Sequence, residues 1–193
     1  VGENGLDNIY IKDISTKEYI YEKFGINLNN ESILITYHPS TLESISPENQ
    51  IKPLINVLKK YTDKYQIIFT GSGNEEGSEI IENLISEFAG NSSNVFFVKH
   101  FGIKNYLRVM RESKCVLGNS SSGIVEAPSF KVPTVNIGSR QKNRMAAKSV
   151  FNCDYNEEEI YNILFKILNS KFDGDFFNNP YDPYRDGKGS ERI

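Results

Sequence analysis

Short apolar runs of strand length alternate along the chain with segments of helical periodicity, and this alternation constrains the fold more than any other feature. Several runs are apolar throughout, which is typical of parallel strands buried on both faces. The sequence therefore predicts an α/β fold, namely a doubly wound, Rossmann-like parallel sheet with right-handed crossovers. The predicted strands cover residues 33–37, 67–70, 95–98, 115–117, 133–137 and 150–153.

Helix signals fill the segments between these runs. Ser46 is a favourable N-cap residue, and Pro47 follows it at the first helical position. Apolar residues at helical spacing predict helices over about 47–58, 80–88, 106–110 and 156–168. We expect three parts, which are a linker and lead-in helix (1–32), the sheet domain (33–170) and an irregular tail that leads to a truncated C-terminal helix (171–193).

Charge and cysteine usage narrow the class of protein. A net charge of −3 over 193 residues predicts no nucleic-acid partner and no affinity for an acidic membrane. No apolar stretch approaches the length of a membrane span. Cys115 and Cys153 lie in apolar runs, so we expect buried free thiols and a cytoplasmic protein. No Cys/His set has zinc spacing, and we predict no metal site.

In a doubly wound sheet, ligands bind beyond the carboxyl ends of the strands, so the turns there are the candidate sites. The strongest is the run from Gly118 to Glu126, in which a buried strand enters small residues and then a helix. Free N–H groups at a helix start favour an anion, and the hydroxyls of Ser120 and Ser121 can donate to phosphate oxygens. A carboxylate one turn into that helix, at Glu126, suits the two hydroxyls of a ribose. Capping of the helix by serines is the alternative.

Two further turns follow the first two strands. His38 stands at a strand end beside Pro39, where binding residues collect, and functional and structural roles are equally supported. The turn at Gly71–Glu76 contains a Gly-x-Gly but lacks the third glycine of a dinucleotide fingerprint. We interpret it as a plain turn and assign it no role.

Two more strand ends carry cations or aromatic rings. His100 and Phe101 follow Lys99, so a base could stack on Phe101, or this ring could belong to the core. Arg140 begins a run of three cations after residue 137, and its planar fork suits a phosphate. A solvated charged face is the alternative for this run.

Together these stretches resemble the C-terminal half of the UDP-N-acetylglucosamine 2-epimerases, with the closest likeness to the hydrolysing branch of sialic and legionaminic acid synthesis. The resemblance is carried by residues 37–39, 98–101, 118–128 and 135–141. It covers nearly the whole chain but about half of the enzyme. It implies one half of a two-domain GT-B architecture, with the ligand in the cleft between the domains.

The resemblance also implies roles for single residues. Ser120 and Ser121 would hold the diphosphate of a UDP-sugar, and Glu126 would hold the ribose hydroxyls. His100 and Phe101 would lie beside the uracil, and Arg140 would line the nucleotide site. The catalytic residue in this half would be His38, near the diphosphate.

The implied reaction is anti elimination of UDP from a UDP-N-acetylglucosamine-type sugar, followed by addition of water. It needs no cofactor, and the acids that act at C2 would belong to the N-terminal domain that this chain lacks, so we expect the fragment to be inactive alone. The resemblance also implies that the full-length protein is a homo-oligomer. Alternatives are the donor domain of a GT-B glycosyltransferase and a non-catalytic module that senses nucleotide sugars.

Overall fold

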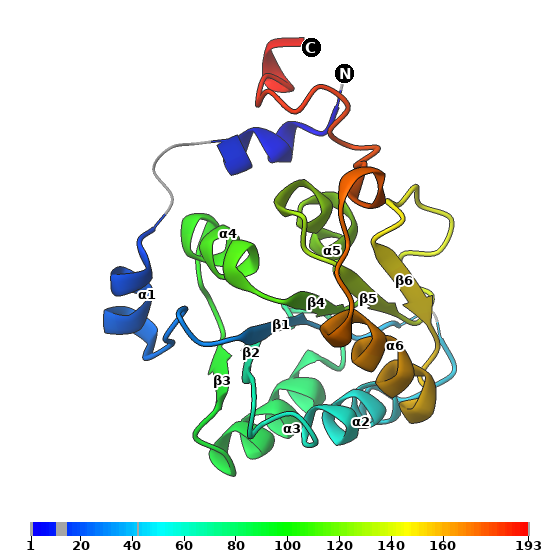
Figure 1. Ribbon diagram of the computed structural model, residues 1–193. Coiled ribbons are helices and arrows are strands. Elements are labelled where there is room, and N and C mark those ends of the chain that lie inside the picture. Colours follow the sequence, from blue (N-terminus) through cyan, green and yellow to red (C-terminus); the bar gives the residue numbers. More distant parts are fainter. Residues whose placement is uncertain (1, 11–14, 42, 193) are drawn as a thin grey trace.

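The computed structural model describes residues 2–10, 15–41 and 43–192, so Val1 and Ile193 of the predicted lead-in and tail lie outside it. Its centre is a six-stranded parallel sheet with strand order β3-β2-β1-β4-β5-β6 (Figure 1). The strands are β1 (Ser32–Thr36), β2 (Gln66–Thr70), β3 (Val95–Val98), β4 (Cys115–Gly118), β5 (Thr134–Ile137) and β6 (Val150–Cys153). The order reverses between β1 and β4, which places a topological switch point there.

All six predicted strands are present, with bounds that differ by at most one residue, and the doubly wound parallel sheet is confirmed. The predicted cap at Ser46 forms, since its side chain accepts from the backbone N–H of Asn49, and Thr16 caps α1 in the same way by accepting from Tyr19. The longer helices are α1 (Lys17–Phe24), α2 (Pro47–Leu58), α3 (Ser78–Gly90), α4 (Ile103–Glu112) and α6 (Glu157–Asn169).

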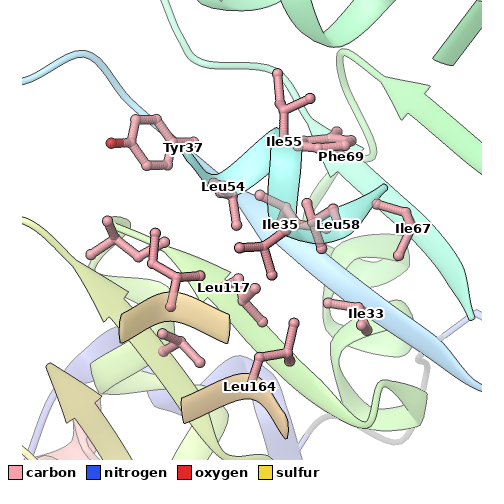
Figure 2. Packing of buried hydrophobic residues seen from close by; sticks show 14 of the residues in the cluster. Ile33, Ile35, Tyr37, Leu54, Ile55, Leu58, Ile67, Phe69, Leu117 and Leu164 are labelled. Atoms are coloured by element: carbon pink, nitrogen blue, oxygen red, sulfur yellow. The ribbon is translucent and has the colours of Figure 1, made fainter. Parts of the chain in front are cut away.

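Helices cover both faces of the sheet. Helices α2, α3 and α6 lie on one face, and α1, α4 and the short helix α5 (Ser122–Val125) lie on the other (Figure 1). Successive residues of β1 divide between the two layers, because Ile33 and Ile35 pack toward α2 whereas Leu34 packs toward α4. Figure 2 shows the first of these cores, in which Ile35, Leu54 and Leu58 lie close together. Burial on both faces explains why the strands are apolar throughout.

The helix after the serine-rich turn is short. It ends at Val125, and the 3-10 helix η2 (Ala127–Phe130) follows. The reason is Pro128, which has no N–H to continue the helical hydrogen bonds. Glu126 therefore lies at the junction of the two helices, about one turn after the start of α5.

The two ends of the described chain lie side by side (Figure 1). The 3-10 helix η1 (Asn4–Tyr10) contacts the tail, where the hydroxyl of Tyr10 donates to the carboxylate of Asp182 at 2.6 Å. Asp182 also accepts from Ser129 at 2.8 Å, which ties the tail to η2. Over residues 171–192 the tail contains the short 3-10 helices η3 (Gly174–Phe177) and η4 (Ser190–Arg192).

Both cysteines are buried and neither forms a disulfide. Among the described residues, no helix combines the length and the apolar character that crossing a bilayer requires.

Candidate functional site

The turns after β1 and β4 meet at the switch point and are fastened together by one buried amide. The Asn119 side chain accepts from the backbone N–H of His38 at 2.8 Å and donates to the His38 carbonyl at 2.7 Å. The Asn119 carbonyl in turn accepts from the side chain of Gln141 at 2.8 Å, which brings in the turn after β5. This arrangement fixes the backbone of His38 beside the serine turn, by which we mean Gly118–Ser122.

One ring nitrogen of His38 is held by a backbone carbonyl. The Nδ1 atom lies 2.7 Å from the carbonyl oxygen of Ser72, in the turn after β2. Because a carbonyl oxygen only accepts, Nδ1 carries a proton. Nε2 is then an acceptor in the neutral ring and a donor in the charged ring. The turn at Gly71–Gly77, called the glycine turn below, thus orients the histidine.

A chain of hydroxyl groups leads into the serine turn. Thr70 donates to Thr36 at 3.1 Å, Thr36 lies 3.2 Å from the hydroxyl of Tyr106, and Tyr106 lies 2.5 Å from the hydroxyl of Ser122. Ser122 donates to the Oγ atom of Ser120 at 3.1 Å. Each hydroxyl has one proton, so the chain runs in one direction and leaves the proton of Ser120 as a donor to a ligand.

Glu126, at the end of α5, has an incompletely satisfied carboxylate. Its Oε2 atom is buried and has no hydrogen-bond partner among the described residues. Burial raises the pKa of this carboxyl group, and the nearby carboxylate of Glu3 acts in the same direction. Its own backbone N–H and the charge of Arg144 act against this rise. An unpaired carboxylate oxygen of this kind is a ready acceptor for hydroxyl groups.

Arg140 stands at the same edge of the sheet but is already engaged. Its guanidinium donates to both carboxylate oxygens of Glu75 at 2.7 and 2.8 Å, and to the carbonyl of Pro39 at 3.2 Å. Ser139, which precedes Arg140, donates to the carboxylate of Glu43 through its N–H at 3.1 Å and through its hydroxyl. The turns after β1, β2 and β5 are therefore linked around Arg140.

His100 and Phe101 differ in their exposure to solvent. His100 is exposed, whereas Phe101 is buried with its ring centroid 4.9 Å from that of Phe24. The ring thus belongs to the core between α1 and α4, as in the alternative interpretation of this stretch. The carbonyl of Phe101 accepts from the Asn105 side chain at 2.6 Å.

Sequence reasoning passed over three residues of this site. Asn119 lies inside the Gly-Asn-Ser-Ser-Ser run, and a side chain with both a donor and an acceptor among small residues was the signal for its bridging role. Tyr106 begins the helix predicted over about 106–110 from its apolar residues, and its hydroxyl joins the polar chain. Glu75 lies on a turn to which we assigned no role, and its pairing with Arg140 is a contact between residues 65 positions apart.

A parallel sheet of this order, with polar turns gathered at its switch point, defines the class of Rossmann-like domains. The chain belongs to the UDP-N-acetylglucosamine 2-epimerase family, whose model matches residues 1–193. The predicted family is thereby confirmed.

Relatives and solved structures agree with this assignment. The chain is 31% identical over 196 residues to UDP-N,N'-diacetylbacillosamine 2-epimerase (hydrolyzing) of Legionella pneumophila, covering 100% of this chain and 49% of the relative. It is 29% identical to polysialic acid biosynthesis protein P7 of Escherichia coli, over 94% of this chain and 46% of that protein. It therefore spans about half the length of these relatives.

The fold matches one half of a two-domain GT-B structure. MnaA of S. aureus, solved with UDP, superposes with a TM-score of 0.72 at 18% identity, and the match covers 100% of this chain and 50% of that one. The predicted GT-B half is thereby confirmed at the level of the fold.

Proposed function

We propose that this chain is the UDP-binding half of a hydrolysing UDP-N-acetylglucosamine 2-epimerase, which converts a UDP-linked N-acetylated sugar to its free 2-epimer and UDP. The observation that carries the proposal is the junction at the switch point, where Asn119 holds His38 beside the serine turn. Family membership and the hydrolysing relative from Legionella support the same reaction.

The diphosphate is assigned to His38, the serine turn and Arg140. Elimination of UDP builds negative charge on the leaving diphosphate, and donors fixed in place stabilise that charge without reorganising. Ser120 offers the terminal proton of the hydroxyl chain, and Ser121 is exposed next to it. When its ring is charged, His38 adds a donor at Nε2, because Nδ1 already donates to Ser72. Arg140 contributes a planar fork that matches phosphate oxygens.

The nucleoside is assigned to Glu126 and to the start of α4. The unpaired Oε2 of Glu126 would accept from the ribose hydroxyls, which satisfies a carboxylate oxygen that otherwise lacks a partner. For the uracil we propose the exposed edge at His100 and the backbone beside Phe101. Phe101 then serves as packing under the base site rather than as an open stacking face, since its ring is 6% exposed.

Proton transfer at C2 of the sugar requires a base and an acid within reach of that carbon. We assign both groups to the part of the longer relatives that this chain does not span. The 193-residue chain alone should then bind UDP weakly and show no turnover. The full-length protein would act as a homo-oligomer with a cytoplasmic supply of UDP-sugar.

The test is product analysis with the full-length protein that contains this chain. Incubation with UDP-N-acetylglucosamine or UDP-N,N'-diacetylbacillosamine should release UDP and the free 2-epimerised sugar, and His38→Gln should lower kcat by about a hundredfold. Transfer of the sugar to an added acceptor would instead identify a glycosyltransferase. Binding of the nucleotide sugar without any product would identify a sensing module.

A further inference from the structure

We propose that Glu75 competes with the diphosphate for Arg140 and so sets the affinity and selectivity of the site for nucleotides. The inference rests on the proposed function, because it takes Arg140 as a ligand-binding residue. In the absence of a ligand the carboxylate of Glu75 pairs with the guanidinium of Arg140, and a bound diphosphate takes its place.

The geometry of the pair is that of a phosphate contact. Arg140 presents both terminal nitrogens to the two oxygens of Glu75 at 2.7 and 2.8 Å. Carboxylate and phosphate are the two groups that match this fork in the same bidentate way. Hydrogen bonds from Arg140 hold the pKa of the Glu75 carboxylate below its usual range, and the charge of Arg140 and a smaller effect of His38 act in the same direction. Glu75 thus pairs with one of the groups that we assign to the diphosphate and feels the charge of another.

The exchange is open to solvent and leaves the core unchanged. The side chains of Arg140 and Glu75 keep 31% and 40% of their surface exposed, so water screens their pairing. Glu75 lies on the exposed part of the glycine turn. The backbone of this turn is held at Ser72 and at Glu75, whose carbonyl accepts from the N–H of Ser78 at 3.0 Å. The carboxylate can therefore leave Arg140 by side-chain rotation while the backbone of the turn keeps its contact with His38.

Charge decides the direction of the exchange. A diphosphate carries more negative charge than one carboxylate, and it would also contact His38 and the serine turn. It therefore displaces Glu75 from the guanidinium of Arg140. Once displaced, the Glu75 carboxylate remains near the bound diphosphate and repels it. Both effects, competition and repulsion, weaken binding of UDP. Removing the charge of Glu75 should therefore strengthen binding, which is the opposite of the usual result for a residue in a binding site.

The experiment measures UDP and uridine binding to the 193-residue chain by calorimetry. Glu75→Gln should bind UDP about threefold or more tightly than the wild type, with uridine unchanged, because uridine has no phosphate to compete for Arg140. The matched control is Glu76→Gln, which removes the same charge from the next exposed position of the turn and should give a clearly smaller gain. In the Arg140→Gln background the gain from Glu75→Gln should largely disappear.

Three results would overturn the proposal. Weaker or unchanged UDP binding by Glu75→Gln would show that Glu75 positions Arg140 for the ligand instead of competing with it. An equal gain from Glu76→Gln would reduce the effect to net charge. Absence of UDP binding to every variant, with thermal melting showing folded protein, would overturn the proposed function and this inference with it.

Discussion

The serine turn after β4 and the glycine turn after β2 lie at the same edge of the sheet, but they are held in different ways. The serine turn is fixed by the buried Asn119 amide and by the part-buried hydroxyl chain through Tyr106. The glycine turn is mostly exposed, and Glu75 joins it to Arg140 through a half-exposed ion pair. One side of the candidate site is preorganised and the other can exchange partners, so substitutions in the two turns should have different consequences.

The largest difference should appear in stability when a methyl group is added to each turn. At Gly118, with φ of 129°, a Cβ atom would overlap the backbone carbonyl of Thr36. Gly118→Ala should therefore lower the free energy of unfolding by about 3 kcal/mol or more. At Gly73 the nearest heavy atom to an added Cβ is Nδ1 of His38 at 3.8 Å, so Gly73→Ala should cost only the positive φ, about 1 kcal/mol.

Urea unfolding of both variants checks this comparison. Equal losses would mean that the two turns are packed alike and that the contrast between them is wrong.

The second prediction concerns UDP affinity and Glu126. Glu126→Gln keeps the shape of the side chain but removes the charge that strengthens hydrogen bonds from the ribose, so UDP affinity should fall about tenfold or more. Affinity for 2′,3′-dideoxy-UDP should barely change. Because the charged carboxylate is partly buried with one unpaired oxygen, the variant should be at least as stable as the wild type at neutral pH.

Calorimetry with both ligands and urea unfolding provide the measurements. A similar loss of affinity for UDP and its dideoxy analogue would remove Glu126 from the ribose site.

The two turns also differ in how well the sequence predicts them. The sheet and the serine turn are specified locally, since apolar runs predict strands and a glycine followed by Asn and serines predicts a polar turn at a strand end. Pro128, which ends the helical hydrogen bonding after the serine turn, is a local signal of the same kind. The glycine turn gave no local signal for its main contact.

Long-range partners account for most of what was missed. The pairing of Glu75 with Arg140 depends on the order of the strands, which places the ends of β2 and β5 on one edge. The burial of Phe101 depends on α1 packing over the start of α4, where Phe24 covers the ring. Hydropathy alone could not distinguish a ring in the core from a ring at a ligand edge, because both follow a strand.

A smaller effect is expected when the hydroxyl chain is cut. Tyr106→Phe removes the donor to Ser122, whose hydroxyl then no longer receives a proton from the chain. The loss should weaken polarisation of Ser120 and reduce UDP affinity about threefold, with uridine affinity unchanged. Calorimetry with both ligands measures this split. Tyr61→Phe is a matched control, because the hydroxyl of Tyr61 is buried, has no partner among the described residues and lies outside the site.

The smallest predicted effect is a difference in how the two turns respond to acid. Burial raises the folded pKa of Glu126 above the ordinary value of 4.5, so the folded state binds more protons than the unfolded state between 4.5 and that raised pKa. The contribution of Glu126 to stability therefore improves as the pH falls from neutral toward 4.5. Hydrogen bonds from Arg140 lower the folded pKa of Glu75, whose stabilising contribution is present above 4.5 and is lost as the pH falls through the lowered value.

Both contributions can be isolated by unfolding the wild type, Glu126→Gln and Glu75→Gln in urea at about pH 7, 5 and 3. The wild type should gain stability relative to Glu126→Gln between the first two conditions. It should lose stability relative to Glu75→Gln between the last two, by only a few tenths of a kcal/mol because this pair is screened by water. Difference curves of the same sign for both variants would contradict the contrast, since they would mean that the two carboxylates experience similar surroundings and that the glycine turn is as preorganised as the serine turn.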